Sequence, residues 1–387
     1  MKNSVRLVAG LAYGDEGKGG IVDYLAGKYN ARAVIRYNGG AQAGHRVVLP
    51  DEREHVFAQF GSGTLRPGVL THLSRFMLIE PIGMMNEYAH LCELGAGDAF
   101  FRTSIDEMAP VITPFHVETN RILELSRGNN RHGSCGLGIG ETMEDVRGLG
   151  KDMLFAGDLG NDSLLRKKLS VIRDCKLAKI RSLSGEIDFD FSNETIEWCR
   201  GRYGEFVKYT NVVDGNFLKT ILGKGNVIFE GAQGMLLDPS HGAPPHVTKT
   251  DITFKNALTL LEEAGFGGKI TRVGVVRGYF TRHGAGPFAT EDEWLTKLLP
   301  DKSNPENEWQ GKFRVGHFDM PLIKQSLRAI GGVDELAITN LDRLIDIGFL
   351  RNKVDARSYA MKLADMLGIK LSILSFGPTA NDKELYN

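Results

Sequence analysis

The sequence lacks long hydrophobic runs, clustered cysteines and an excess of either charge. No run approaches the about 20 apolar residues of a membrane-spanning helix. Charged residues interrupt the N-terminal apolar stretch, so we expect no signal peptide. A formal net charge of −1 provides no basic footprint for nucleic acid. The four cysteines have neither CxxC nor zinc-site spacing, which predicts reduced thiols. Together these absences predict a cytoplasmic protein without a nucleic-acid or membrane partner.

The chain is rich in glycine, and the glycines follow hydrophobic segments. Its 387 residues, 42% of them hydrophobic, can form a large core in one or two α/β domains. Glycine loops after strands are typical of open parallel sheets, which bind ligands at the carboxyl ends of their strands. We therefore predict an α/β fold with a large, mostly parallel central sheet flanked by helices. No composition break divides residues 1–387, so we predict a single domain with a mobile loop at about 292–317.

Hydrophobic patterning predicts the individual elements. Strands are expected near residues 5–11, 33–37, 227–229, 269–277, 335–340 and 369–376, and helices near 20–29, 160–182, 194–209, 253–265, 318–330 and 356–368.

The loop Gly14–Gly20 lies between a predicted strand and a predicted helix. Unpaired backbone N–H groups and the helix dipole at such a junction favour anions. The loop lacks the GxxxxGK[ST] and GxGxxG spacings, and it contains Asp15, a carboxylate that would repel phosphate. Asp15 therefore indicates phosphoryl chemistry in which a carboxylate holds a metal ion or moves a proton. The alternative interpretation is a glycine-rich turn with a surface lysine, Lys18.

Four more clusters are candidate ligand loops. The loop that begins at Asn38 ends at His45, which could donate a proton or stabilise developing phosphoryl charge. The loop Gly133–Gly140 offers small hydroxyl residues and free N–H groups to a monophosphate, or is a flexible linker. Gln233 could hydrogen-bond a base, or belong to a sheet-edge turn. Asp342 could accept two hydrogen bonds from guanine, although aspartates at such positions often cap helices.

Taken together and in this order, the loops resemble the motifs of the adenylosuccinate synthetase family. The family motifs WGDEGKGK, GGxNAGH, GTTGRGIGP, FEGAQGxLLDxxHGxxPxVT, TRVGxGPFPTE and STGP are similar to residues 13–20, 39–45, 133–141, 229–248, 281–291 and 375–378. The resemblance extends over nearly the whole chain and implies the fold of that family, which is related to P-loop proteins.

The resemblance implies a ligase that joins L-aspartate to C6 of a 6-oxopurine nucleoside monophosphate while GTP is hydrolysed. Asp15, His45 and Gln233 would be catalytic, and Asp15 with the carbonyl of Gly44 would hold Mg²⁺. Arg147 would reach the monophosphate of a partner subunit in a homodimer. The implied nucleoside triphosphate site is Gly14, Glu16, Gly17, Lys18, Gly19, Gly44, Asn340, Asp342, Ser375 and Gly377. The implied monophosphate site is Asn38, Gln42, Ser134, Cys135, Arg147, Gln233 and Thr248.

One segment, residues 308–317, departs from the family loop TTGRRRRxGW. Without gaps, the two arginines that grip aspartate in the family align with Gly311 and Phe313. We interpret Lys312 and Arg314 as their replacements in a shifted register. One of the lost arginines lies near the ribose 2′-OH in the family, which favours a deoxynucleotide.

These departures resemble a divergent branch that includes phage enzymes of the 2-aminoadenine DNA pathway, which use dGMP. We favour dGMP as substrate and keep IMP as the alternative, with a nucleotide-binding regulator without ligase activity as a third hypothesis. Two residues are evidence against membership of the phage branch. Asp15 is present where better-known phage members have serine, and Asp342 suits GTP better than ATP.

Overall fold

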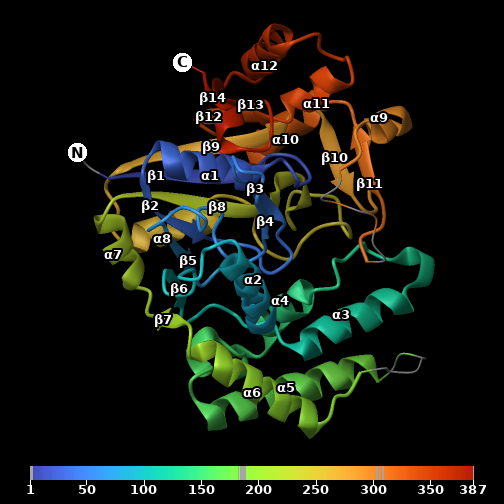
Figure 1. The fold of residues 1–387 in the computed structure, drawn as a ribbon. Helices are drawn as coiled ribbons and strands as arrows, with labels where there is room; N and C mark the ends of the chain where they lie inside the picture. The colour runs from blue at the N-terminus through green and yellow to red at the C-terminus, as the bar shows by residue number, and fades with distance from the viewer. Residues whose placement is uncertain are drawn as a thin grey trace.

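A ten-stranded sheet forms the centre of the computed structural model, which describes residues 3–181, 183, 189–301, 304, 306 and 309–386 (Figure 1). In spatial order its strands are β14 (Lys383–Leu385), β13 (Lys370–Ser375), β12 (Glu335–Thr339), β9 (Lys269–Arg277), β1 (Ser4–Gly10), β8 (Asn226–Gly234), β2 (Ala31–Arg36), β5 (Leu70–Leu73), β6 (Thr103–Asp106) and β7 (Asn211–Val213). All neighbours are parallel except the pair β13 and β14. The predicted α/β class with a mostly parallel sheet is confirmed.

Helices cover both faces of the sheet, and two short hairpins extend from it. The helices are α1 (Lys18–Lys28), α2 (Pro81–Glu93), α3 (Pro114–Ser126), α4 (Ile139–Gly148), α5 (Asp162–Ile180), α6 (Asn193–Val207), α7 (Phe217–Gly223), α8 (Lys255–Glu263), α9 (Glu293–Leu298), α10 (Met320–Ile330), α11 (Leu341–Asp346) and α12 (Lys353–Leu367). One hairpin joins β3 (His45–Val48) to β4 (Glu54–Phe57), and the other pairs β10 (Phe280–His283) with β11 (Phe313–Gly316). Figure 1 shows α3, α5 and α6 as a helical layer at the β7 end, and α11 and α12 at the opposite end.

The central strands are buried on both faces because their side chains alternate between two hydrophobic clusters. Leu7 of β1 and Phe229 of β8 belong to the larger cluster. Val8 and Ile228, one residue along each strand, pack into the cluster that includes the apolar face of α1. Successive residues of a strand point to opposite faces of the sheet, and a parallel sheet covered on both sides needs both faces to be apolar. This is why the strands appear in the sequence as continuous hydrophobic runs.

The predicted strands and helices are present, with ends that differ by a few residues. The strand at 269–277 has the predicted bounds. Ser182, the last residue of a predicted helix, lies outside the described residues. One strand is longer than expected, because β8 continues through Gln233 to Gly234, which pairs with Gly10 after a register shift. The sheet-edge turn considered for Gln233 is therefore wrong.

The segment expected to be a mobile loop contains α9 and β11. Pro305 and Glu308 belong to that segment and lie outside the described residues. The motion of this segment and the single-domain organisation stay predictions. None of the described helices has the length and apolar character needed to cross a membrane.

Removing a central core side chain tests this architecture. Phe229 is fully buried, so Phe229→Ala is expected to lower the free energy of unfolding by about 3–5 kcal/mol, through lost burial and the cavity left behind. Leu125→Ala, at a half-exposed position of α3, is the control and should change it by about 0.5 kcal/mol or less. Urea denaturation measures both, and equal losses in the two variants would contradict the packing described.

Candidate active site

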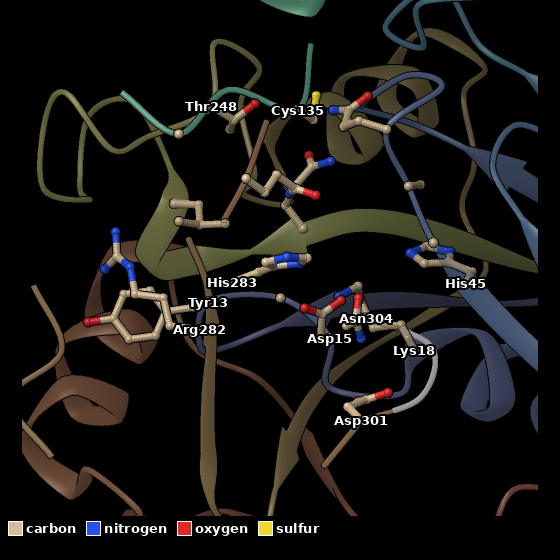
Figure 2. Close-up of a pocket in the computed structure, with 18 of the residues that line it drawn as sticks. Tyr13, Asp15, Lys18, His45, Cys135, Thr248, Arg282, His283, Asp301 and Asn304 are labelled. Carbon is tan, nitrogen blue, oxygen red and sulfur yellow. The ribbon is translucent and has the colours of Figure 1, made fainter. Parts of the chain in front are cut away.

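The carboxyl ends of the parallel strands and the loops that follow them surround one large cavity of about 930 Å³. Most of the residues predicted from the sequence line it: Gly14, Asp15, Gly17, Lys18, Gly19, Gln42, Gly44, His45, Ser134, Cys135, Arg147, Gln233, Thr248, Asn340, Asp342, Ser375 and Gly377. Figure 2 shows Thr248 and Cys135 on one side of this space, and Asp15 and Lys18 on the other. Loops that are far apart in the sequence thus form one site.

The loop Gly14–Gly20 is held together by a buried ion pair. Glu16 and Lys18 are 1% and 3% exposed, and the lysine Nζ lies 2.6 Å from Glu16 Oε2. Glu16 Oε1 accepts hydrogen bonds from the backbone N–H groups of Ala12 and Gly14, at 3.0 and 2.9 Å. The predicted contact between Glu16 and a nucleotide is therefore corrected, because this carboxylate shapes the loop from inside and does not line the cavity.

Asp15 faces the cavity from a left-handed backbone conformation, with φ of 57°. Burial raises the pKa of Asp15, although the charges of Arg277 and Lys18 oppose the shift. The Arg277 guanidinium donates from Nε to the Asp15 carbonyl and from Nη2 to Asp301 Oδ2, the latter at 3.0 Å. A carboxylate whose pKa is raised is a better proton acceptor than an ordinary aspartate. Neither Arg277 nor Asp301 is apparent as a site residue from the sequence, because each lies outside the glycine motifs.

His45 is oriented by a buried glutamate, Glu230, in the middle of the central strand β8. Its Nδ1 lies 2.6 Å from Glu230 Oε1. The backbone N–H of Ser62 donates to Glu230 Oε2 at 2.9 Å, and its hydroxyl donates to Oε1. Burial alone would raise the pKa of Glu230, but His45, Arg36 and the Ser62 hydroxyl outweigh it and hold the pKa at about 2. An ionised carboxylate only accepts hydrogen bonds, so Nδ1 carries the proton and Nε2 is left for a substrate.

The loop Gly133–Gly140 differs from its prediction in one respect. Two of the N–H groups expected to be free, those of Gly133 and Ser134, donate to Glu124 Oε1 at 2.7 and 3.2 Å. Glu124 is fully buried, and the Gly136 N–H donates to Ser134 Oγ at 3.2 Å. The loop is thus rigidified by protein groups and is no open linker. Burial raises the pKa of the Cys135 thiol, which keeps it protonated.

Two glutamines that line the cavity have buried polar atoms without partners in the described part of the chain. These atoms are Nε2 and Oε1 of Gln42 and Oε1 of Gln233. Gln233 also adopts a left-handed conformation, with φ of 56°. An unsatisfied buried polar group costs about 1–3 kcal/mol, and strained backbone is concentrated at functional sites. Both observations point to a polar ligand at this place.

Asn38 does not line the cavity, which corrects its predicted contact with the monophosphate. Its Nδ2 donates to the Asp251 carbonyl at 2.9 Å, and its Oδ1 accepts from the Ala232 N–H at 2.8 Å. The side chain therefore ties β8 to the segment after Thr248 and acts on the site only through the backbone.

Lys312 and Arg314 are also absent from the cavity lining. The Arg314 guanidinium pairs with Glu291 and donates to the carbonyls of Gly284 and Gly286, so it holds the hairpin of β10 and β11 together. Arg314 is thus occupied by protein groups in this structure, and the prediction that these two residues grip the amino-acid substrate stays a prediction.

His283 lines the cavity at this end, and it was not predicted. Its Nε2 lies 3.2 Å from the carbonyl oxygen of Gly311, and Figure 2 shows its ring between Asp15 and the Thr248 side of the space. The signal was available in the sequence, because the family motif has valine where this chain has His283.

Arg147 lies in the last turn of α4, at the rim of the cavity. Its side chain is exposed and makes no hydrogen bond or ion pair with the rest of the described chain. At the far end, burial raises the pKa of Asp342, and the Ser375 hydroxyl donates to the Gly377 carbonyl at 3.1 Å.

A parallel sheet with an anion-binding loop, a cavity-facing carboxylate and a histidine fixed by a buried glutamate defines a nucleotide-dependent enzyme. A family model described as adenylosuccinate synthetase matches residues 7–354. The chain belongs to the adenylosuccinate synthetase family and is a ligase that forms a carbon–nitrogen bond in purine biosynthesis.

Curated relatives agree with this assignment, and solved structures agree with the fold. The chain is 33% identical to the adenylosuccinate synthetase of Chlorobium limicola, over 87% of this chain and 76% of that protein. It is 30% identical to that of Wolbachia pipientis wMel, over 87% of this chain and 77% of that protein. The fold matches the fully ligated adenylosuccinate synthetase of Plasmodium falciparum with a TM-score of 0.81 and 21% identity, over 99% of this chain and 100% of that one. It also matches the succinoaminodeoxyadenylate synthetase of cyanophage S-2L, which was solved with dGMP and dATP. The TM-score is 0.70 and the identity 18%, over 100% of this chain and 96% of that one.

Replacing Glu230 tests the orientation of His45. In Glu230→Gln the new amide N–H can donate to Nδ1, which places the histidine proton on the other nitrogen. We expect kcat to fall by about 10²-fold, the scale of a general acid–base contribution, with little change in KM. Glu263→Gln, at an exposed position, is the matched control. Steady-state kinetics measure both, and a wild-type kcat in Glu230→Gln would contradict the role assigned.

The pH profile tests the environment of Asp15. Since only the carboxylate form accepts a proton, kcat/KM should fall as pH falls through a pKa above that of an ordinary aspartate. Arg277→Met removes the nearby charge that lowers this pKa most, so the acid limb should move to higher pH. Arg328→Met, exposed on α10, should leave the limb in place. A shift to lower pH in Arg277→Met would contradict this account.

Proposed function

We propose that the protein joins L-aspartate to C6 of a 6-oxopurine nucleoside monophosphate and hydrolyses GTP as it does so. One observation carries the proposal: Asp15, His45 and the amide oxygen of Gln233, which has no partner among the described residues, line the same cavity as the loop Gly14–Gly20. Such a reaction needs three groups in one place: a base, a group that stabilises charge during phosphoryl transfer, and a polar contact for the nucleobase.

The chemistry runs in two steps. Asp15 accepts the proton from purine N1, and O6 attacks the γ-phosphorus as the bond to the β-phosphate oxygen breaks. His45 stabilises the charge on the transferring phosphoryl group. The amine of aspartate then attacks C6 and loses a proton to solvent, and phosphate leaves with the former O6. The phosphorylation matters because the unmodified oxygen at C6 is a poor leaving group.

The residues present fit Mg²⁺. The carboxylate of Asp15 and the carbonyl of Gly44 both line the cavity and are hard oxygen ligands. Among the described residues no group of three His, Cys, Asp or Glu side chains could hold a metal by itself. Mg²⁺ is commonly held by one or two carboxylates together with substrate phosphates, and it supplies neutralisation of phosphate charge when bound.

For the monophosphate we propose dGMP ahead of IMP. The supporting observation is the hairpin segment 309–316, of which only Gln310 lines the cavity, whereas Lys312 and Arg314 do not. Because neither cation of this segment lines the cavity, neither is placed to select a ribose 2′-OH there. The curated relatives, which are named adenylosuccinate synthetases, support IMP as the second candidate. The presence of Asp342 in the cavity supports GTP as the energy donor.

We further propose a homodimer in the cytoplasm. The exposed Arg147 at the cavity rim has no partner in the described part of its own chain, and a second subunit would provide one as its bound monophosphate. The Arg147 guanidinium can pair with a phosphate through two parallel hydrogen bonds.

The experiment is incubation of the pure protein with L-aspartate, Mg²⁺, GTP or ATP, and either IMP or dGMP. We expect a succinyl adduct by mass spectrometry, formed faster from dGMP, and at least about 10²-fold slower turnover in Asp15→Asn. Faster use of IMP would overturn the substrate preference alone. Tight nucleotide binding without an adduct from any combination, unaffected by Asp15→Ala, would instead favour a regulator and overturn the ligase proposal.

A further inference from the structure

Lys383 is a buried lysine without a carboxylate within ion-pair distance in the part of the chain that the structure describes. Its side chain is 9% exposed. The ammonium Nζ donates to the carbonyl oxygens of Gly377, Pro378 and Thr379, at 2.9, 2.9 and 2.8 Å. All three of its N–H groups are therefore satisfied by one short loop.

This arrangement leaves a positive charge next to the cavity. Burial lowers the pKa of Lys383 to about 8, although the more distant carboxylates of Asp382, Asp23 and Asp342 oppose the shift. Carbonyl dipoles satisfy the hydrogen bonds of an ammonium group without cancelling its charge, so burying it is costly. A cost of this kind at a cavity wall calls for a functional reason.

The position of Lys383 connects the carbonyl loop to two walls of the site. β14 runs back antiparallel to β13, which pairs Lys383 with Ser375. Lys383, Gly377 and Pro378 line the cavity beside Asp342. A Cβ atom on Gly20, in the first turn of α1, would lie 3.4 Å from the lysine Nζ. The ammonium thus lies between the C-terminal loop and the helix that follows the anion-binding loop.

The loop itself is closed by further bonds. Thr379 donates its backbone N–H and its hydroxyl to Asp382 Oδ2, at 2.8 and 2.7 Å, and the Phe376 N–H donates to the Asp382 carbonyl. Without Lys383, the carbonyls of Gly377, Pro378 and Thr379 would lose the donor that they share next to α1.

We propose that Lys383 is a positioning residue for the nucleoside triphosphate: it fixes the loop 375–379 against α1 and places a positive charge at the triphosphate end of the cavity. This inference rests on the function proposed above. It assigns a role to a residue outside every motif that the sequence shares with the family. Lys383 makes no contact with reacting atoms, so its effect is on affinity for the triphosphate and not on the chemical steps.

The test is equilibrium dialysis of Mg²⁺ and GTP with the full-length Lys383→Met variant. The Kd for GTP is expected to rise at least about tenfold, the equivalent of one or two lost charge-assisted hydrogen bonds. The Kd values for IMP and dGMP are expected to stay at wild-type levels, and kcat at saturating GTP to stay within about twofold, since binding and not chemistry is affected. Lys370→Met, exposed at the start of β13, is the matched control.

The outcomes separate this proposal from the proposed function. If the wild-type protein binds GTP but forms no adduct, the ligase proposal fails and the dialysis still decides the role of Lys383. An unchanged Kd for GTP in Lys383→Met, or equal weakening of the binding of all ligands, overturns the positioning role.

If thermal unfolding shows that this variant does not fold, Lys383→Arg is measured instead. It keeps the charge, but its planar fork cannot meet three carbonyls around one point, so the Kd for GTP should rise at least about threefold. A wild-type Kd there overturns the proposal.

Discussion

The buried ion pair between Glu16 and Lys18 is the constraint on which the rest of the site depends. Glu16 lies so close to the strands that a Cβ atom on Gly10 or Gly234 would be 2.3 or 2.5 Å from its carboxylate oxygens. The glycines of β1 and β8 therefore make room for a carboxylate inside the loop, and that carboxylate organises the turn through two backbone N–H groups. Glu16 points inward, whereas its neighbour Asp15, in a left-handed conformation, faces the cavity. The anion-binding loop can thus contain a carboxylate that acts on the substrate.

The same arrangement recurs around the cavity. Glu230 orients His45, and Glu124 occupies the backbone N–H groups of the loop that begins at Gly133. In each case a buried carboxylate accepts its hydrogen bonds from the protein and fixes a neighbouring group for the ligand. Rigid positioning of this kind is what phosphoryl transfer requires, since little of its catalysis comes from covalent participation of the protein. The C-terminal loop around Lys383 extends the pattern with an ammonium in place of a carboxylate.

The fold was largely predictable because the central strands are buried on both faces and are continuous hydrophobic runs in the sequence. The strand at 269–277 is an example. The helix that follows the Asp15 loop was also predicted, from its own apolar residues. The three- or four-residue strands β5, β6 and β7 were missed, because so short a segment has no readable period. Within the site, glycine-flanked residues such as His45 were found. The sequence did not predict that Glu16, Asn38 and Arg314 form their hydrogen bonds within the protein. A sequence does not show whether the partner of a polar side chain is the protein or a ligand.

The most direct test of the account follows the oxygen at C6. The monophosphate that gives the adduct, IMP or dGMP, is prepared with ¹⁸O at position 6 and converted with L-aspartate, Mg²⁺ and GTP. If Asp15 and His45 promote phosphoryl transfer to O6, the label is found in the inorganic phosphate that is released, with one ¹⁸O for each adduct formed. Unlabelled phosphate alongside adduct formation would contradict the 6-phosphoryl route and the roles assigned to both residues.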